Sequence, residues 1–286
     1  MSKLIKRLNK KFLFNEKPGI KLFDVSLRDG LQSKEKIYSF DEKKKLLHNI
    51  INVHKPNSIE VGSIVSSKVL PQMNHSIDLY KYAKKLDNDI KYYLLIPSKN
   101  KLKIALDNNV ENMSFISSFS DSFQKKNIKM TLNDTIKDIK VMDNILYNNN
   151  LLNNKLYLSC FNDCPIEGNI NYDSILFNLV EYTHLKSFDE ICLSDTTGNL
   201  KYEDFKELIN NITKLINANK LSLHLHFNKE NEDNLLEIIN HGLKYSITKL
   251  DISSIEDGGC SVTMDKSKLN SNLTYDILNK LLTKLE

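Results

Sequence analysis

Short runs with β-strand character alternate with longer amphipathic runs along most of this 286-residue chain. The strand-like runs are residues 20–27, 58–62, 91–96, 112–116, 155–160, 190–193, 221–227 and 249–255. Helical spacing is found in stretches such as residues 41–53, 77–86, 133–147, 202–216 and 232–241. Eight β/α units without a linker, and with no Gly-x-Gly-x-x-Gly turn, predict an α/β protein with a single (β/α)8 TIM barrel.

The composition allows a sizeable core and argues against several kinds of partner. With 41% hydrophobic residues, the chain is long enough for one large domain or two smaller ones. Because the repeated units run without a break, we expect a basic lead-in over residues 1–19 and one catalytic barrel domain over residues 20–286. The net charge of +4 comes from scattered lysines, which predicts no nucleic-acid partner. No apolar stretch is as long as a membrane span, so no membrane partner is expected.

The cysteines and the first residues bear on the cellular compartment. The four cysteines contain no C-x-x-C pair and are too few for a disulfide scaffold, which indicates a reduced, intracellular protein. Residues 1–15 are basic and lack any acidic residue, but they contain only one Ser and one Arg. A cytoplasmic location is therefore expected, with a mitochondrial transit peptide as the alternative.

Two histidines lie close together near the end of the run at residues 221–227. Side chains alternate between the faces of a strand, so His224 and His226 share a face with Ser222, away from the leucines. Two imidazoles on one face suit either a divalent metal or a catalytic dyad. Two structural histidines are the simpler alternative.

Other reactive side chains follow the predicted strands in the same way. Arg28, Asp29, Glu60, Asp195 and Cys260 all lie at or just beyond the C-terminal end of a strand-like run. Barrel enzymes place their chemistry at this end because the βα loops converge there. The pattern therefore predicts an active site at one mouth of the barrel.

The first strand-like run has two faces of different polarity. Alternation predicts that one face carries apolar side chains toward the helices, namely Phe23, Val25 and Leu27. The other face would point into the barrel and carries Asp24, Ser26 and Arg28. Polar side chains inside a barrel are costly unless they pair or reach the open mouth, so this face also favours a site.

Several segments resemble the motifs of one enzyme family, in order and with similar spacing. Residues 27–32, LRDGLQ, contain the R-D-G-L-Q signature of the 3-hydroxy-3-methylglutaryl-CoA lyases, which are related to isopropylmalate synthases. Further similar segments are residues 59–63 with 71–73, 119–128, 157–168, 193–198, 224–226 and 258–260. The resemblance implies a metal-dependent TIM-barrel lyase that cleaves 3-hydroxy-3-methylglutaryl-CoA to acetyl-CoA and acetoacetate.

The resemblance also implies a role for each reactive residue. Arg28 would stabilise an enolate, Glu60 would orient Arg28 or the base, and Cys260 would be a mobile acid or base. Asp195 is a further candidate catalytic residue, and Gln32 is a candidate substrate-binding residue. The implied cofactor is Mg²⁺ or Mn²⁺, and its candidate ligands are Asp29, His224, His226 and Asn270.

Departures from the family pattern leave alternatives open. Phe227 stands where the family has Asp, and residues 261–270 lack the Gly and Pro of the family's loop. Asn270 lies one residue beyond the family spacing, and Asn272 is a second candidate. There are two alternatives to the lyase. One is a related Claisen-type enzyme that acts on another acyl-CoA or oxo acid, and the other is a non-catalytic, ligand-binding descendant. For the lyase we expect an acyl-CoA substrate as the partner and a homodimer as the assembly.

Overall fold

The predicted strands form one closed barrel in the computed structural model, which describes residues 19–86, 89–256, 258, 263–264 and 270–285. The barrel strands are β1 (Lys21–Asp24), β2 (Ser58–Ser63), β3 (Lys91–Leu95), β4 (Met113–Ser118), β5 (Asn154–Ser159), β8 (Phe188–Ser194), β9 (Leu221–His224) and β11 (Lys249–Ile252). All neighbours pair in parallel, in the order β1-β11-β9-β8-β5-β4-β3-β2. The predicted (β/α)8 TIM barrel is confirmed. Apart from Gly19, the expected lead-in lies outside the described residues.

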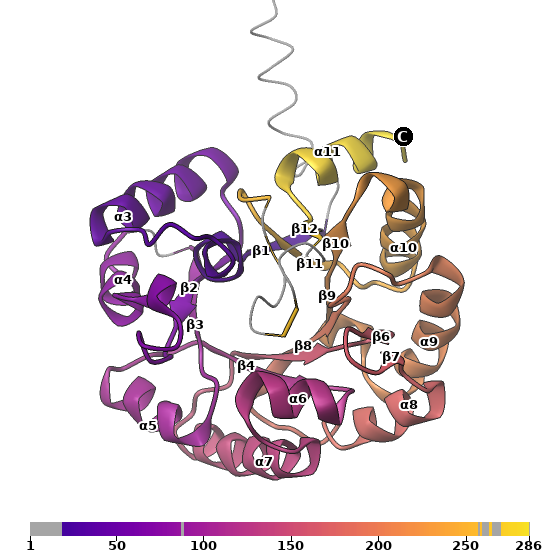
Figure 1. Cartoon of the computed structure of the whole chain (residues 1–286), viewed down its shortest axis with the longest axis horizontal. Helices are drawn as coiled ribbons and strands as arrows, with labels where there is room; N and C mark the ends of the chain where they lie inside the picture. Colours follow the sequence, from indigo (N-terminus) through magenta and orange to yellow (C-terminus); the bar gives the residue numbers. More distant parts are fainter. Residues whose placement is uncertain (1–18, 87–88, 257, 259–262, 265–269, 286) are drawn as a thin grey trace, which may run out of the picture.

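A ring of helices surrounds the strands (Figure 1). They are α3 (Phe40–Asn49), α4 (Ser76–Ala83), α5 (Lys99–Asp107), α6 (Asp121–Ile128), α7 (Leu132–Asn148), α8 (Tyr172–Val180), α9 (Tyr202–Leu215), α10 (Glu232–Lys244) and α11 (Tyr275–Thr283). The helical ranges named from the sequence correspond to α3, α4, α7, α9 and α10. Apolar residues of strands and helices make one large core between the two layers. Among the described residues, no helix is both long and apolar enough to cross a membrane.

The faces of β1 differ from the prediction. Phe23 and Val25 cluster with Tyr93 apart from the main core, whereas the carboxylate of Asp24 accepts a hydrogen bond from the hydroxyl of Tyr275 on α11 at 2.8 Å. Phe23 therefore points into the barrel and Asp24 toward the helices, so the prediction was wrong for these residues, whereas Leu27 packs in the main core as predicted. The reason is local: β1 ends at Asp24, and a helical turn at Ser26–Gly30 breaks the alternation before Arg28.

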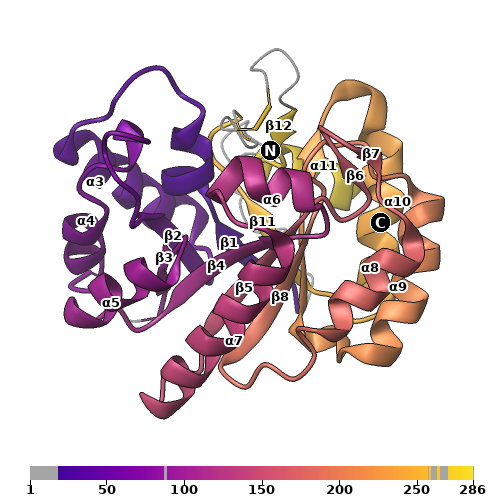
Figure 2. The same cartoon turned by 60° about the horizontal axis from the view of Figure 1, so that its bottom comes forward.

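Irregular segments gather at the end of the barrel where the strands finish (Figure 2). They include the hairpin of β6 (Asp163–Cys164) with β7 (Gly168–Asn169), and the antiparallel pair of β10 (His226–Phe227) with β12 (Ser271–Asn272). The turn that follows β1 is fully buried at the same end. The turn after β1 and strand β10 supply Arg28, Asp29 and His226 to the candidate site.

Candidate metal centre and active site

Three buried side chains from different segments converge at the mouth of the barrel. Asp29 comes from the turn after β1, His224 ends β9, and His226 begins β10. One ligand atom from each lies within 4.8 Å of the others. A carboxylate and two imidazoles at this spacing are a donor set that can hold a divalent metal ion.

The hydrogen bonds of the two histidines assign their free nitrogens. Nδ1 of His226 lies 2.6 Å from the backbone oxygen of Asp195, and Nδ1 of His224 lies 3.2 Å from the Asp251 carboxylate. Carbonyl and carboxylate oxygens accept, so both Nδ1 atoms carry hydrogen, and in a neutral imidazole this leaves the lone pair on Nε2. Nε2 of His226 is buried without a hydrogen-bond partner in the described part of the chain. A metal ion would satisfy this atom, so the residues fit one.

The charge states also suit metal binding. Burial and the neighbouring His224 lower the pKa of His226 to about 4, which keeps the imidazole neutral at pH 7. Burial opposes ionisation of Asp29, but Arg28 and the two histidines outweigh it and bring the pKa of Asp29 to about 2. At neutral pH the cluster therefore offers an ionised carboxylate and a neutral His226.

Arg28 is held by two carboxylates next to this cluster. Its Nε donates to Glu60 at 2.5 Å and its Nη1 donates to Asp29 at 2.6 Å, and its guanidinium lies 5.3 Å from the ring centre of Tyr157. Burial disfavours the charge, but Glu60 and Asp29 together hold the pKa of Arg28 above its usual value. Glu60 is itself fully buried and also accepts from the hydroxyls of Ser114 and Tyr157. The result is a fixed cation in a defined orientation.

Asp195 contacts the candidate metal-binding cluster through His226 and is not among the residues that line the cavity. Its carboxylate accepts from the backbone N–H groups of Gly198 at 3.0 Å and Leu200 at 3.3 Å, and burial raises its pKa to about 7. Its backbone carbonyl holds His226, while its neighbours Ser194 and Thr196 line the cavity. The structure thus places Asp195 where it shapes the loop after β8 and orients a histidine.

The two asparagine candidates occupy different places. The amide of Asn270 donates to the backbone oxygen of Thr197 at 2.6 Å and packs on Gly198. Asn272 pairs with His226 across the β10–β12 ladder, and its side chain hydrogen-bonds with Asp29. The backbone of Gly258 approaches the Asn272 side chain so closely that an added Cβ would lie 2.4 Å from its Cγ. Of the two, Asn272 is the one that touches the cluster.

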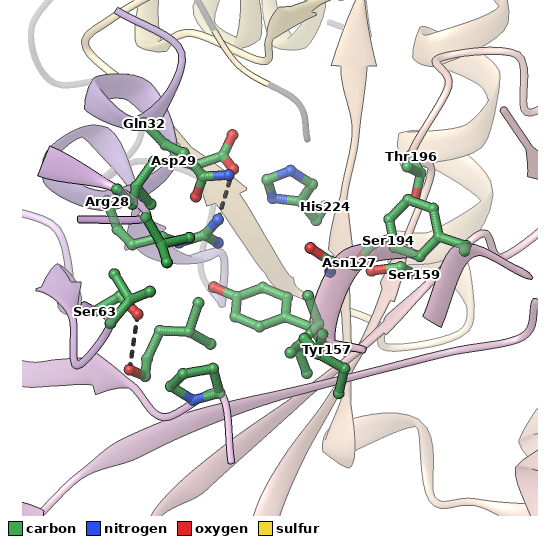
Figure 3. A pocket seen from close by; sticks show the side chains of 18 of the residues that line it. Arg28, Asp29, Gln32, Ser63, Asn127, Tyr157, Ser159, Ser194, Thr196 and His224 are labelled. Carbon is green, nitrogen blue, oxygen red and sulfur yellow. Dashed lines mark hydrogen bonds and ion pairs between the residues drawn. The ribbon is translucent and has the colours of Figure 1, made fainter. Parts of the chain in front are cut away.

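A cavity of about 140 Å³ opens beside these residues (Figure 3). Its polar lining includes Arg28, Asp29, Gln32, His224 and His226, so the arginine, the metal cluster and the predicted substrate-binding residue share one cavity. Cys260 lies outside the described residues. Thr263 accepts, through its backbone oxygen, a hydrogen bond from Lys126 of α6 at 3.0 Å, and other residues of this helix line the cavity.

Some residues of the site were not singled out from the sequence. Tyr157 and Ser159 line the cavity, and Ser114 supports Glu60. Tyr157 and Ser159 belong to the resembling segment 157–168, so that motif contained a signal for them. Ser114 carries no such signal, because a serine inside a strand is common and its partner lies 54 residues away.

Comparison with known proteins identifies the family of the chain. The HMGL-like family matches residues 19–230 of the chain. A mitochondrial hydroxymethylglutaryl-CoA lyase of Arabidopsis thaliana is 25% identical over 84% of this chain, which spans 50% of that protein. A 3-hydroxy-3-isohexenylglutaryl-CoA/hydroxymethylglutaryl-CoA lyase of Pseudomonas aeruginosa is 24% identical over 84% of this chain and 78% of its own length.

The fold is also that of a solved structure from this group. An HMG-CoA lyase from Acinetobacter baumannii, in complex with coenzyme A and 3-methylmalate, superposes with a TM-score of 0.82 at 22% identity. The superposition covers 93% of this chain and 84% of the other. At this identity the likeness shows the fold, and the family match covers more than half of the sequence. The chain belongs to the HMGL-like family.

Proposed function

We propose that this protein is a divalent-metal-dependent carbon–carbon lyase that cleaves 3-hydroxy-3-methylglutaryl-CoA to acetyl-CoA and acetoacetate. The observation that carries the proposal is the triad of Asp29, His224 and His226 beside the fixed guanidinium of Arg28, all in one cavity. Family membership and relatives with this activity support it.

The proposed reaction is a retro-Claisen cleavage. The tertiary hydroxyl at C3 loses its proton, the bond between C2 and C3 breaks, and its electron pair forms the enolate of acetyl-CoA. The C3 oxygen becomes the ketone of acetoacetate, and a proton taken up at the enolate carbon completes acetyl-CoA. A bound Mg²⁺ or Mn²⁺ would make the hydroxyl more acidic and orient it.

The residues of the chain supply the other requirements. Arg28 is proposed to stabilise the enolate oxygen with directed N–H donors, in an orientation that Glu60 and Asp29 maintain. Gln32 lines the same cavity and is proposed to contact substrate. Cys260 remains the proposed mobile acid or base on its glycine-flanked loop. Asp195 is proposed to support catalysis by orienting His226 through its carbonyl.

The fourth protein ligand is proposed to be Asn272. Asn272→Ala is expected to weaken Mn²⁺ binding by at least about tenfold, because it removes an amide beside Asp29 and His226. Asn270→Ala, the same chemical change two residues away, should leave the affinity unaltered, because its amide is bonded to Thr197. Calorimetric titration of both variants with Mn²⁺ measures this. The reverse order of affinities would restore Asn270 as the ligand.

The activity test is a direct one. The purified chain, with Mg²⁺ or Mn²⁺ and 3-hydroxy-3-methylglutaryl-CoA, should release acetoacetate and acetyl-CoA in equal amounts. Release of products only from another acyl-CoA or oxo acid would favour the related Claisen-type enzyme. Metal binding without turnover of any of these compounds would favour the non-catalytic descendant.

A second candidate substrate is favoured by the apolar part of the cavity. Val65, Val69, Leu70, Leu95 and Ile116 line it, which is more apolar surface than a single methyl branch requires. A 3-hydroxyglutaryl-CoA with a longer alkyl branch would use that surface, as the name of the Pseudomonas aeruginosa relative suggests. If kcat/KM is higher for an isohexenyl than for a methyl branch, the second candidate replaces the first.

The cellular setting is part of the same proposal. We propose an acyl-CoA as the small-molecule partner and no nucleic-acid partner, in line with the coenzyme A bound by the Acinetobacter baumannii enzyme. We also propose that the chain forms a homodimer and is located in the cytoplasm, with the mitochondrion as the alternative location. Sedimentation equilibrium and fractionation of the expressed full-length chain would test these points.

A further inference from the structure

A buried ionic cluster lies inside the barrel next to the proposed metal centre. Lys155 of β5 is fully buried, and its ammonium pairs with Asp251 of β11 and with Glu190 of β8 at 2.7 Å. Because β5 and β11 are not neighbours, Lys155 reaches across the barrel interior to make the first of these pairs. The ammonium also lies 3.8 Å from the ring centre of Phe23 and 4.8 Å from that of Tyr157.

Asp251 joins this cluster to the metal centre. One of its carboxylate oxygens accepts from Lys155, and the other lies 3.2 Å from Nδ1 of His224. An ionised carboxylate only accepts hydrogen bonds, so it selects the form of His224 with hydrogen on Nδ1 and a lone pair on Nε2. Only that form leaves Nε2 available as a metal ligand.

The two histidines of the triad are held in different ways. His226 is oriented by a backbone carbonyl, whereas His224 depends on a side chain from another strand. A carboxylate buried without a countercharge would be strongly unfavourable, and Lys155 provides that charge. Neither Asp251 nor Lys155 lines the cavity, so contact with substrate does not account for them.

We propose that Asp251 is a positioning residue for the metal centre: it orients His224 for metal binding, and Lys155 keeps it in place. This inference rests on the metal centre of the proposed function. It predicts that metal affinity depends on a side chain that touches neither metal nor substrate. Partners that orient ligating histidines are typically worth about 10–100-fold in metal affinity.

The test uses three variants of the full chain and Mn²⁺ as the probe. Asp251→Asn keeps the shape of the side chain and removes its charge. Lys155→Met combined with Asp251→Leu removes both charges, so that no unpaired ion remains if the single variant unfolds. Glu190→Gln is the matched control, because Glu190 also pairs with Lys155 but makes no contact with His224. Circular dichroism and melting curves establish which variants are folded.

The expected result is that Mn²⁺ binds about 10–100-fold more weakly to each folded Asp251 variant, and with unchanged affinity to Glu190→Gln. Binding is measured by calorimetry without substrate. The unmodified, metal-free chain gives a second readout, because ¹⁵N spectra of histidine-labelled protein report which nitrogen of His224 carries hydrogen. The His224 signal is assigned by its loss in His224→Gln.

Native affinity in a folded Asp251 variant, or a His224 in the unmodified chain with hydrogen on Nε2 and none on Nδ1, would overturn the inference. An unmodified chain that does not bind Mn²⁺ would overturn both the inference and the metal centre. An unmodified chain that binds Mn²⁺ through an Asp251-dependent site but cleaves no acyl-CoA would remove the proposed activity alone. The two failures are therefore distinguishable.

Discussion

Replacing Arg28 by lysine is expected to lower the turnover of 3-hydroxy-3-methylglutaryl-CoA by about 10²–10³-fold, the range found when one oxyanion donor is removed. Arg28 uses Nε and Nη1 to bind Glu60 and Asp29, so its remaining N–H groups are the donors available to a substrate. Lysine keeps the charge, but it has no planar set of donors that could bind Glu60, Asp29 and the substrate at the same time. Steady-state kinetics should show the loss mainly in kcat, with a modest change in KM.

Two further measurements test whether the loss of turnover comes from the directed donors of Arg28. Arg28→Lys should lose much less Mn²⁺ affinity than turnover, because lysine keeps a positive charge beside Asp29. Tyr157→Phe removes only a hydroxyl that contacts Glu60 at 3.4 Å and should cost much less turnover. A lysine variant with native kcat would mean that charge alone suffices and would contradict the directed role of the guanidinium.

The convergence of the site could be predicted from strand ends. Arg28, Asp29 and Glu60 follow or lie on the first two strands, and His224 ends β9, so a closed parallel barrel must bring them to one mouth. No detail of side-chain packing is needed for that argument. The same reasoning identified His224 and His226 as neighbours, although the chain breaks its strand between them at Leu225.

Details that depend on long-range pairing could not be predicted. Spacing favoured Asn270 as the ligand, with Asn272 as the second candidate, whereas the β10–β12 ladder brings Asn272 rather than Asn270 to Asp29. On β1, alternation extended through a helical turn assigned Phe23 and Asp24 to the wrong faces. On β1 the alternation was carried across a turn that is not a strand, whereas the choice of asparagine depends on a pairing between distant segments.

The pairing of Lys155 with Asp251 shows a further limit. The partners of Asp251 lie 96 and 27 residues away in the sequence, on strands whose registers are set by the whole barrel. A single sequence contains no signal for such a contact. The proposed metal ligands follow from motifs at the strand ends, whereas the residues proposed to orient them follow from the closed fold.

Removal of the metal is expected to abolish activity, and either Mg²⁺ or Mn²⁺ should restore it. Two imidazoles and a carboxylate leave coordination positions for water and substrate, so the ion should exchange and be removed by a chelator. The neutral state of His226, whose pKa lies at about 4, means that protons do not compete with the metal at that residue near pH 7. Turnover is measured after dialysis against chelator and again after each ion is added back.

Substitution of the histidines tests the same centre without a chelator. His226→Ala removes a buried Nε2 that has no hydrogen-bond partner among the described residues, so it should eliminate Mn²⁺ binding and turnover. It also removes buried volume and the hydrogen bond to Asp195, so a melting curve must show that the variant is folded. His75→Asn is the matched control, because His75 is half exposed at the start of α4 and asparagine tolerates its left-handed φ of 63°. Full activity in the metal-free chain, or in His224→Ala combined with His226→Ala, would rule out the assignment. If both treatments abolish turnover and the control does not, the chemistry depends on a metal ion at this triad.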